Sequence, residues 1–139
     1  MKITAYVASA FSKNHEGGNK AGVVFMTQPL TRTQKMAIAK ELGFAETAFI
    51  SDSKIADFRL EYFTPKEEVD LCGHATIGAF TIMNHLNKLL QTAYTIETNS
   101  GLLAITANGE QLFMEQTVPT FYDTLTLEEL SGCFRSEER

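Results

Sequence analysis

The stretch that decides the fold reads Asp70-Leu71-Cys72-Gly73-His74-Ala75-Thr76-Ile77-Gly78-Ala79-Phe80-Thr81-Ile82-Met83. The only Asp, Glu, Lys or Arg in this stretch is Asp70, at its start. Residues 75–83 therefore place no charge on any face of a helix. A helix that is apolar all round is a buried helix. We therefore predict one helix from about residue 74 to residue 89, with residues 75–83 nearly inaccessible to solvent.

The segments around this stretch show the two-residue period of half-buried strands. Strands are expected at residues 2–7, 22–26, 47–51, 57–63, 94–98, 102–107 and 111–117, the last two joined by a turn at Asn108-Gly109-Glu110. Capping boxes at Thr31 and Thr126 predict two further helices, which Gly43 and Gly132 would end. The first of these would pack through Met36, Ile38, Ala39 and Leu42. We expect an α+β fold in which about seven mostly antiparallel strands curl round one buried central helix.

The composition indicates a globular protein and argues against several classes of function. The 139 residues suit one domain, and 44% of them are apolar and 21% charged. A net charge of −5 without a basic cluster argues against nucleic acid as a partner. No apolar run is long enough for a membrane span. Two cysteines and three histidines without disulfide or metal-ligand spacing lead us to expect no metal and a reducing cytoplasm.

The start of the predicted central helix is the most informative candidate site. The first N–H groups of a helix have no partner within it, and the helix dipole favours an anion there. Gly73 would let a ligand approach the backbone closely, and His74 can add a side-chain donor. This pattern predicts a carboxylate-binding site. The alternative is that Asp70 caps the helix and His74 is an ordinary core residue, and the spacing does not decide between the two.

Three other side chains could carry chemistry, each with a structural alternative. Glu46 is a lone carboxylate in an apolar stretch, where burial would raise its pKa toward neutrality, but strand alternation could also point it to solvent. A thiol at a helix N-terminus, such as Cys72, could act as a base, although a buried apolar cysteine is the commoner case. Asn19, in a Gly-Gly-Asn loop, could bind substrate or only shape the turn.

Taken together, these segments resemble one protein family. The motifs are Glu16-Gly17-Gly18-Asn19-Lys20-Ala21-Gly22-Val23-Val24, Ala45-Glu46-Thr47-Ala48-Phe49, Tyr62-Phe63-Thr64-Pro65, Glu68-Val69-Asp70-Leu71-Cys72-Gly73-His74-Ala75-Thr76 and Met114-Glu115-Gln116. They occur in the order, and at about the spacing, found in phenazine-biosynthesis-like (PhzF-type) proteins. The resemblance covers residue 1 to about residue 121.

The resemblance implies a diaminopimelate-epimerase-like fold. Such proteins have two similar halves, each a curled sheet round a central helix, with the active site between them. By this resemblance Glu46 is the catalytic acid/base, and Gly73, His74 and Ala75 form the segment that holds substrate. Cys72 matches a position that holds a thiol base in the wider epimerase and racemase group. No cofactor and no metal are implied.

The chain departs from the family pattern in two motifs and in length. Gly-Asn-Pro appears as Gly18-Asn19-Lys20, and Ser-Glu-Thr appears as Ala45-Glu46-Thr47, which lacks a hydroxyl beside the glutamate. Family members are roughly twice as long. We therefore expect residues 1–121 to form the N-terminal domain and residues 122–139 to be a connector toward a second domain that this chain does not contain.

Three functional hypotheses follow from these expectations. The first is an isomerase domain that moves a proton on a small carboxylate-bearing metabolite and carries about half of the active site. The second is a non-catalytic domain that binds a small anion and has lost turnover. The third restores a complete site, because two copies could pair as a homodimer and imitate the two halves.

Overall fold

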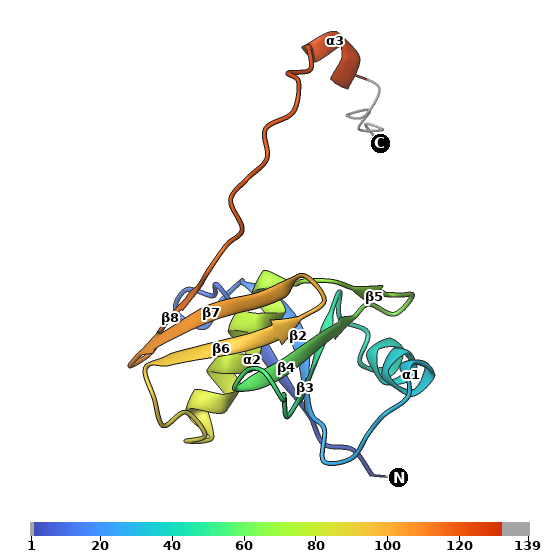
Figure 1. The fold of residues 1–139 in the computed structure, drawn as a ribbon. Coiled ribbons are helices and arrows are strands. Elements are labelled where there is room, and N and C mark those ends of the chain that lie inside the picture. Colours follow the sequence, from blue (N-terminus) through green and yellow to red (C-terminus); the bar gives the residue numbers. More distant parts are fainter. Residues whose placement is uncertain (1, 132–139) are drawn as a thin grey trace.

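One curled sheet wraps round a single helix in the computed structural model, which describes residues 2–131 (Figure 1). The strands in that part of the chain are β1 (Ala5–Ala10), β2 (Asn19–Phe25), β3 (Thr47–Ser51), β4 (Phe58–Phe63), β5 (Glu68–Val69), β6 (Ala93–Thr98), β7 (Gly101–Asn108) and β8 (Gln111–Met114). The helices there are α1 (Arg32–Leu42), α2 (Gly73–His85) and α3 (Leu127–Leu130). The predicted α+β class, with a curled sheet round a central helix, is confirmed.

The order of strands in the sheet is β1-β2-β3-β4-β6-β7-β8, with β5 added beside β4. The β2–β3 and β4–β6 pairs are parallel, and the other pairs are antiparallel. Parallel neighbours need a crossover connection, which is usually a helix. In this chain α1 connects β2 to β3, and α2 lies in the connection from β4 to β6. The expectation of mostly antiparallel strands is therefore correct, and the two helices explain the exceptions.

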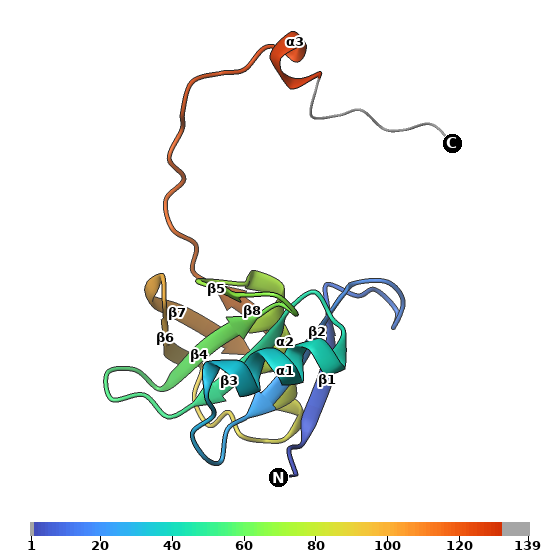
Figure 2. The same ribbon diagram turned by 90° about the vertical axis from the view of Figure 1, so that its right-hand side faces the viewer.

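Helix α2 fills the inside of the curl and contacts strands from both ends of the sheet, β1 and β2 on one side and β8 on the other (Figures 1 and 2). The residues of α2 that are buried are Ala75, Thr76, Gly78, Ala79, Phe80 and Met83. The prediction of a buried helix is thus correct, except that Thr81 is exposed. A side chain added at Gly78 would come within 3.2 Å of the Ala8 Cβ, so glycine permits the close approach of α2 to β1.

The helix ends earlier than predicted, at His85 and not near residue 89. Asn87 adopts a left-handed φ of 53°, and its N–H donates to the Asn84 carbonyl. The N–H of Lys88 donates to the Met83 carbonyl at 2.9 Å. These two bonds form a Schellman ending, in which asparagine takes the place that glycine usually holds.

Helix α1 covers the outer face of the sheet over β3 and β4 (Figure 2). Its capping box at Thr31 and its left-handed Gly43 end are present as predicted. Its predicted packed face is present, with Ala39 buried and with Met36 and Ile38 partly buried in the same cluster, and Lys35 is buried in addition. The Lys35 Nζ lies 2.5 Å from the Glu61 carboxylate on β4, and this pairing makes the burial of a lysine tolerable.

Removing this ammonium group should destabilise the fold. The side chains of Lys35 and Glu61 are only 8% and 16% exposed, so Lys35→Met would leave a largely buried carboxylate unpaired. We expect a loss of about 1–3 kcal/mol in the free energy of unfolding, measured by urea denaturation. Lys40→Met, at an exposed position of the same helix, is the matched control and should change stability by less than about 0.5 kcal/mol. Equal effects of the two changes would contradict the buried pairing.

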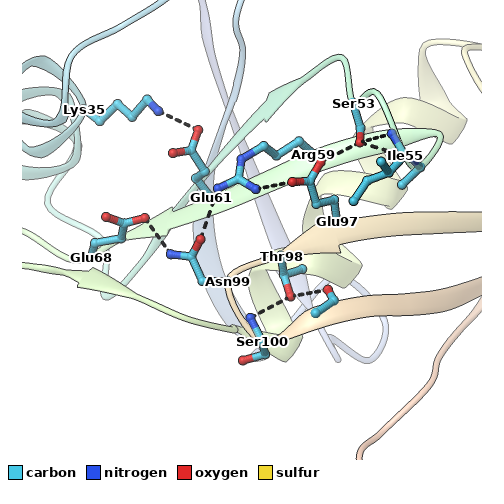
Figure 3. A network of polar contacts seen from close by, with 12 residues as sticks. Lys35, Ser53, Ile55, Arg59, Glu61, Glu68, Glu97, Thr98, Asn99 and Ser100 are labelled. Carbon is cyan, nitrogen blue, oxygen red and sulfur yellow. Dashed lines mark hydrogen bonds and ion pairs between the residues drawn. The ribbon is translucent and has the colours of Figure 1, made fainter.

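A polar network ties β4 to the β6–β7 turn and to β5 (Figure 3). Arg59 contacts the Glu97 carboxylate at 2.6 Å and the Asn99 side chain at 3.1 Å, and Asn99 donates to Glu68 at 2.8 Å. The hydroxyl of Ser53 donates to Glu97 at 2.6 Å. This hydrogen bond, aided by Arg59, holds the pKa of Glu97 below its usual value. The network is on the side of the sheet away from α2, so it supports the fold and not the candidate site.

The chain beyond β8 leaves the body of the molecule (Figure 1). Strand β8 ends at Met114, and residues 115–126 form no helix or strand. Thr126 caps α3 with the predicted box. The predicted end of that helix at Gly132 lies outside the described residues, and the division into residues 1–121 and 122–139 stays a prediction.

Candidate active site

The start of α2 has an N-cap residue but no side-chain cap. Cys72 is the N-cap residue, with extended backbone, and its side chain makes no capping hydrogen bond. Asp70 is exposed before it, so the alternative in which Asp70 caps the helix is wrong. Gly73 is exposed, and a Cβ built on it meets no atom within 4 Å. The helix N-terminus therefore has free space beside Gly73, and the carboxylate site expected there stays a prediction.

Glu46, which directly precedes β3, lies at this N-terminus although it is distant from α2 in the sequence. Its Oε2 is 3.3 Å from the Nε2 of His74, and its side chain is 23% exposed. The other ring nitrogen of His74, Nδ1, is 3.3 Å from the sulfur of Cys72. The structure thus brings together Glu46, His74 and Cys72, and the alternative that Glu46 points away into solvent is not what the structure shows.

The position of Glu46 depends on a close approach of β2 to β3. Glu46 immediately precedes β3, and its carbonyl accepts a hydrogen bond from the N–H of Gly22 at 3.1 Å. A Cβ on Gly22 would come within 2.7 Å of the Thr47 hydroxyl and 2.8 Å of the Leu42 side chain. Only glycine fits there, so Gly22 lets β3 lie where it carries Glu46 to the start of α2.

The contacts define a consistent arrangement of protons in the cluster. If the Cys72 thiol donates to Nδ1, then His74 carries its proton on Nε2, facing the Glu46 carboxylate. The opposite tautomer would place a lone pair against the carboxylate. The Nε2 atom is buried and has no hydrogen-bond partner among the described residues, because the Glu46 contact lacks hydrogen-bond geometry. A donor is therefore available at the site for an acceptor placed beside Glu46.

The environment of Cys72 favours the thiol over the thiolate. Burial raises the pKa of Cys72, and the nearby Glu46 carboxylate raises it further. The backbone N–H groups of Ala75 and His74 lower it, but by less. Cys72 therefore serves better as a hydrogen-bond donor to His74 than as a base, since a base must be deprotonated at working pH.

This pKa shift predicts slow alkylation of Cys72 at neutral pH. In the variant Cys133→Ser, Cys72 is the only cysteine. Iodoacetamide should modify it more slowly at pH 7 than it modifies a free thiol, because the thiolate is the nucleophile. The rate should keep rising with pH beyond the usual thiol pKa of about 8.5, followed by mass spectrometry. A fast, pH-independent reaction near pH 7 would contradict the raised pKa.

Two buried hydroxyls hold the first turn of α2 in place. The Thr76 hydroxyl donates to the Cys72 carbonyl at 2.7 Å, and it lies 2.6 Å from the Tyr62 hydroxyl. Tyr62 is fully buried on β4, and burial raises the pKa of its phenol well above the usual value. Neither residue was among the predicted site residues, and the available signal was the hydroxyl of Thr76, four residues after the N-cap.

The remaining predicted site residues take different positions. Ala75 is fully buried, so its side chain packs in the core and only its backbone faces the helix N-terminus. Asn19 begins β2, opposite Ala10 of β1, and is exposed. Among residues 2–131, no hydrogen bond or ion pair joins Asn19 to Glu46, so the role of Asn19 in binding stays a prediction.

A comparison with models of protein families identifies the family of the chain. The model for phenazine biosynthesis-like proteins (PhzC-PhzF) matches residues 8–131. The chain belongs to this family. The resemblance of its motifs to PhzF-type proteins is thereby confirmed.

Several relatives of this PhzF-like chain are named as isomerases. It is 37% identical over 125 residues to the uncharacterized isomerase YddE of Escherichia coli O157:H7, and the matched region covers 87% of this chain and 42% of that protein. It is 35% identical over 117 residues to the uncharacterized isomerase YfhB of Bacillus subtilis, covering 81% of this chain and 40% of that protein. The chain therefore spans less than half the length of these curated relatives.

Solved structures support the same fold. A PhzF-family protein of Bacillus anthracis matches with a TM-score of 0.79 and 38% identity, over 88% of this chain and 44% of that one. A probable proline racemase from Agrobacterium radiobacter matches with a TM-score of 0.60 at 12% identity, which shows a shared fold alone. The diaminopimelate-epimerase-like architecture is confirmed. Among residues 2–131, no helix is both long and apolar enough to cross a membrane.

Proposed function

We propose that this PhzF-like chain supplies half of an active site that isomerises a small carboxylate-bearing metabolite by proton transfer. The observation that carries the proposal is the Glu46 carboxylate beside the uncapped N-terminus of α2, 3.3 Å from His74. Membership of a family whose relatives are named isomerases supports the reaction class. Neither a cofactor nor a metal is needed for this chemistry in the proposal.

In this proposal Glu46 acts as the acid/base. Its carboxylate takes a proton from a substrate carbon whose C–H is activated by a neighbouring carbonyl or double bond. The electron pair left behind is delocalised into that group, and the protonated Glu46 then returns the proton to a different carbon or to the opposite face. Because the proton is returned, the substrate and the product have the same composition, as isomerisation requires.

The start of α2 would bind the substrate carboxylate. The N–H groups of Gly73 and His74 and the helix dipole favour an anion there, and the Nε2 proton of His74 adds a donor. The same groups stabilise negative charge that develops during proton transfer. Cys72 remains a candidate base by resemblance, but its raised pKa favours Glu46 for this role.

A second half would have to close the site. Glu46 is 23% exposed, and water at an open site weakens the electrostatic contacts that catalysis uses. We propose that a second copy of the chain can provide the closure. Large apolar side chains exposed on residues 115–131 support pairing; they are Val118, Phe121, Tyr122, Leu125 and Leu127. A non-catalytic anion-binding domain is the alternative, and the isomerase relatives do not favour it.

The test is solvent-deuterium exchange measured together with the mass in solution. The protein is incubated in D2O with small carboxylates that carry an activated C–H, and deuterium incorporation is followed by NMR. Sedimentation at the same concentrations gives the fraction of paired chains. We expect exchange to rise with that fraction. Efficient exchange by a strictly monomeric sample would refute the half-site proposal, and paired protein that exchanges no substrate in the set but binds carboxylates would favour the non-catalytic alternative.

A further inference from the structure

The buried hydroxyls of Tyr62 and Thr76, called the hydroxyl pair below, contact the first turn of α2 in a fixed order. A carbonyl can only accept, so the Thr76 hydroxyl donates its proton to the Cys72 carbonyl, at 2.7 Å. The Tyr62 hydroxyl, 2.6 Å from the Thr76 oxygen, must then be the donor in the second bond. We propose that the hydroxyl pair has a positioning role: it fixes the peptide between Cys72 and Gly73 so that the Gly73 N–H points at the substrate carboxylate. This inference deepens the proposed function and rests on its carboxylate site.

One peptide unit connects the hydroxyl pair to the carboxylate site. A trans peptide is planar, and its C=O and N–H bonds point in opposite directions. A Cys72 carbonyl held toward Thr76 therefore directs the Gly73 N–H the other way, out of the helix. Among residues 2–131, no atom accepts a hydrogen bond from that N–H, and a Cβ on Gly73 would meet no atom within 4 Å. This donor is therefore left for a ligand.

The peptide between Cys72 and Gly73 has few other restraints. Cys72 is the N-cap residue, but its side chain makes no capping hydrogen bond. Gly73 has no Cβ, so the backbone there can rotate more freely than at other residues. The Cys72 carbonyl also accepts the Thr76 N–H at 3.0 Å, but this is the terminal bond of the helix, and helix ends fray. The Thr76 hydroxyl adds the second bond that holds the carbonyl in one direction.

The hydroxyl pair also connects the carboxylate site to the proposed base. Tyr62 is on β4, directly opposite Ala48 of β3, and Glu46 immediately precedes β3. The strands that carry Glu46 and Tyr62 are therefore paired, and Tyr62 holds the helix start against them. Burial raises the pKa of the Tyr62 phenol, so this hydroxyl keeps its proton and stays a donor near neutral pH. The connection matters for catalysis because a misplacement of about 1 Å can lower a rate about 10²-fold.

The direction of the Gly73 N–H bond can be measured by NMR on the full chain without ligand. Its residual dipolar coupling in a weakly aligned sample reports that direction. We expect Thr76→Val, which keeps the shape of the side chain but loses the hydroxyl, to change the coupling. Thr76→Ser, which keeps the hydroxyl but loses a methyl group, should retain the wild-type coupling. An unchanged coupling in Thr76→Val, or an equal change in Thr76→Ser, would overturn the positioning role.

A second threonine of the same helix provides a matched control. The Thr81 hydroxyl donates to the Ile77 carbonyl at 2.8 Å, four residues earlier, as the Thr76 hydroxyl does to Cys72. Thr81→Val should therefore leave the Gly73 coupling unchanged. A change as large as in Thr76→Val would mean that loss of any such bond disturbs the helix, which would overturn a specific role of the hydroxyl pair.

The double variant Tyr62→Phe/Thr76→Val covers the case in which Thr76→Val folds poorly. Removing both partners leaves no buried hydroxyl unpaired, and such paired replacements can be nearly neutral for stability. The double variant should therefore fold and show an altered Gly73 coupling. A wild-type coupling in this folded variant would overturn the inference, because neither hydroxyl is then needed to orient the peptide.

Acetate is the probe for the consequence at the carboxylate site. Titration with acetate should shift the Gly73 amide signal of the wild type, and Thr76→Val should weaken that binding about tenfold, since a hydrogen bond to a charged group contributes about that much or more. Thr76→Ser and Thr81→Val should bind acetate as the wild type does. A changed coupling in Thr76→Val with undiminished acetate affinity would overturn the inference. A wild-type Gly73 amide that does not respond to acetate would instead refute the carboxylate site of the proposed function, while the coupling, measured without ligand, decides the orientation of the peptide in either case.

Discussion

Glu46→Gln is expected to lower the rate of solvent-deuterium exchange by about 10²–10⁴-fold, the usual contribution of a general acid or base. Glutamine keeps the size and the polar contacts of the side chain but cannot take up a proton at neutral pH. The carboxylate-binding groups are on α2 and are unchanged by the substitution. We therefore expect the loss in kcat, with a much smaller change in KM, measured by NMR on a substrate that the wild type exchanges.

A matched control separates this effect from a general change in charge. Glu41 is exposed on α1, outside the candidate site, and Glu41→Gln should leave the exchange rate unchanged. If Glu46→Gln keeps the wild-type rate in paired protein, Glu46 is not the base. If Cys72→Ser then abolishes exchange, the base is the thiol of Cys72.

The fold could be predicted where the sequence signal was local. The absence of charge over residues 75–83 identified the buried helix, and strict alternation identified β4. The end of α2 was missed because Asn87, in the left-handed conformation, replaces the more common glycine. Strand β1 was placed three residues early, because its small residues, Ala8, Ser9 and Ala10, carry little strand signal.

The candidate site could be predicted only in part. Cys72 and His74 are two residues apart at a helix start, so their proximity follows from the local sequence. Glu46 reaches them only because Gly22 lets β2 and β3 approach, and no pattern in the sequence shows that contact. The burial of Lys35 was missed for the same reason, since its partner lies on β4. Long-range pairings of this kind required the structure, or the resemblance to a family.

The same central helix that positions the site should dominate the stability of the domain. Phe80 is fully buried on α2, and its ring packs against Phe58 and Tyr94 with centroids 6.0 and 5.8 Å apart. Phe80→Ala should therefore lower the free energy of unfolding by about 3–5 kcal/mol, through lost burial and a remaining cavity.

That loss is a large part of the total for a marginally stable domain, about 5–15 kcal/mol, so the urea midpoint should fall steeply and some chains should unfold without denaturant. Phe113→Ala is the matched control, because that ring on β8 is 59% exposed and should contribute little. The start of α2 carries Cys72, Gly73 and His74, so a loosened helix should also weaken carboxylate binding in Phe80→Ala. Similar unfolding free energies for the two variants would mean that α2 is not the centre of the core. The placement of the candidate site at the start of a buried central helix would then be wrong.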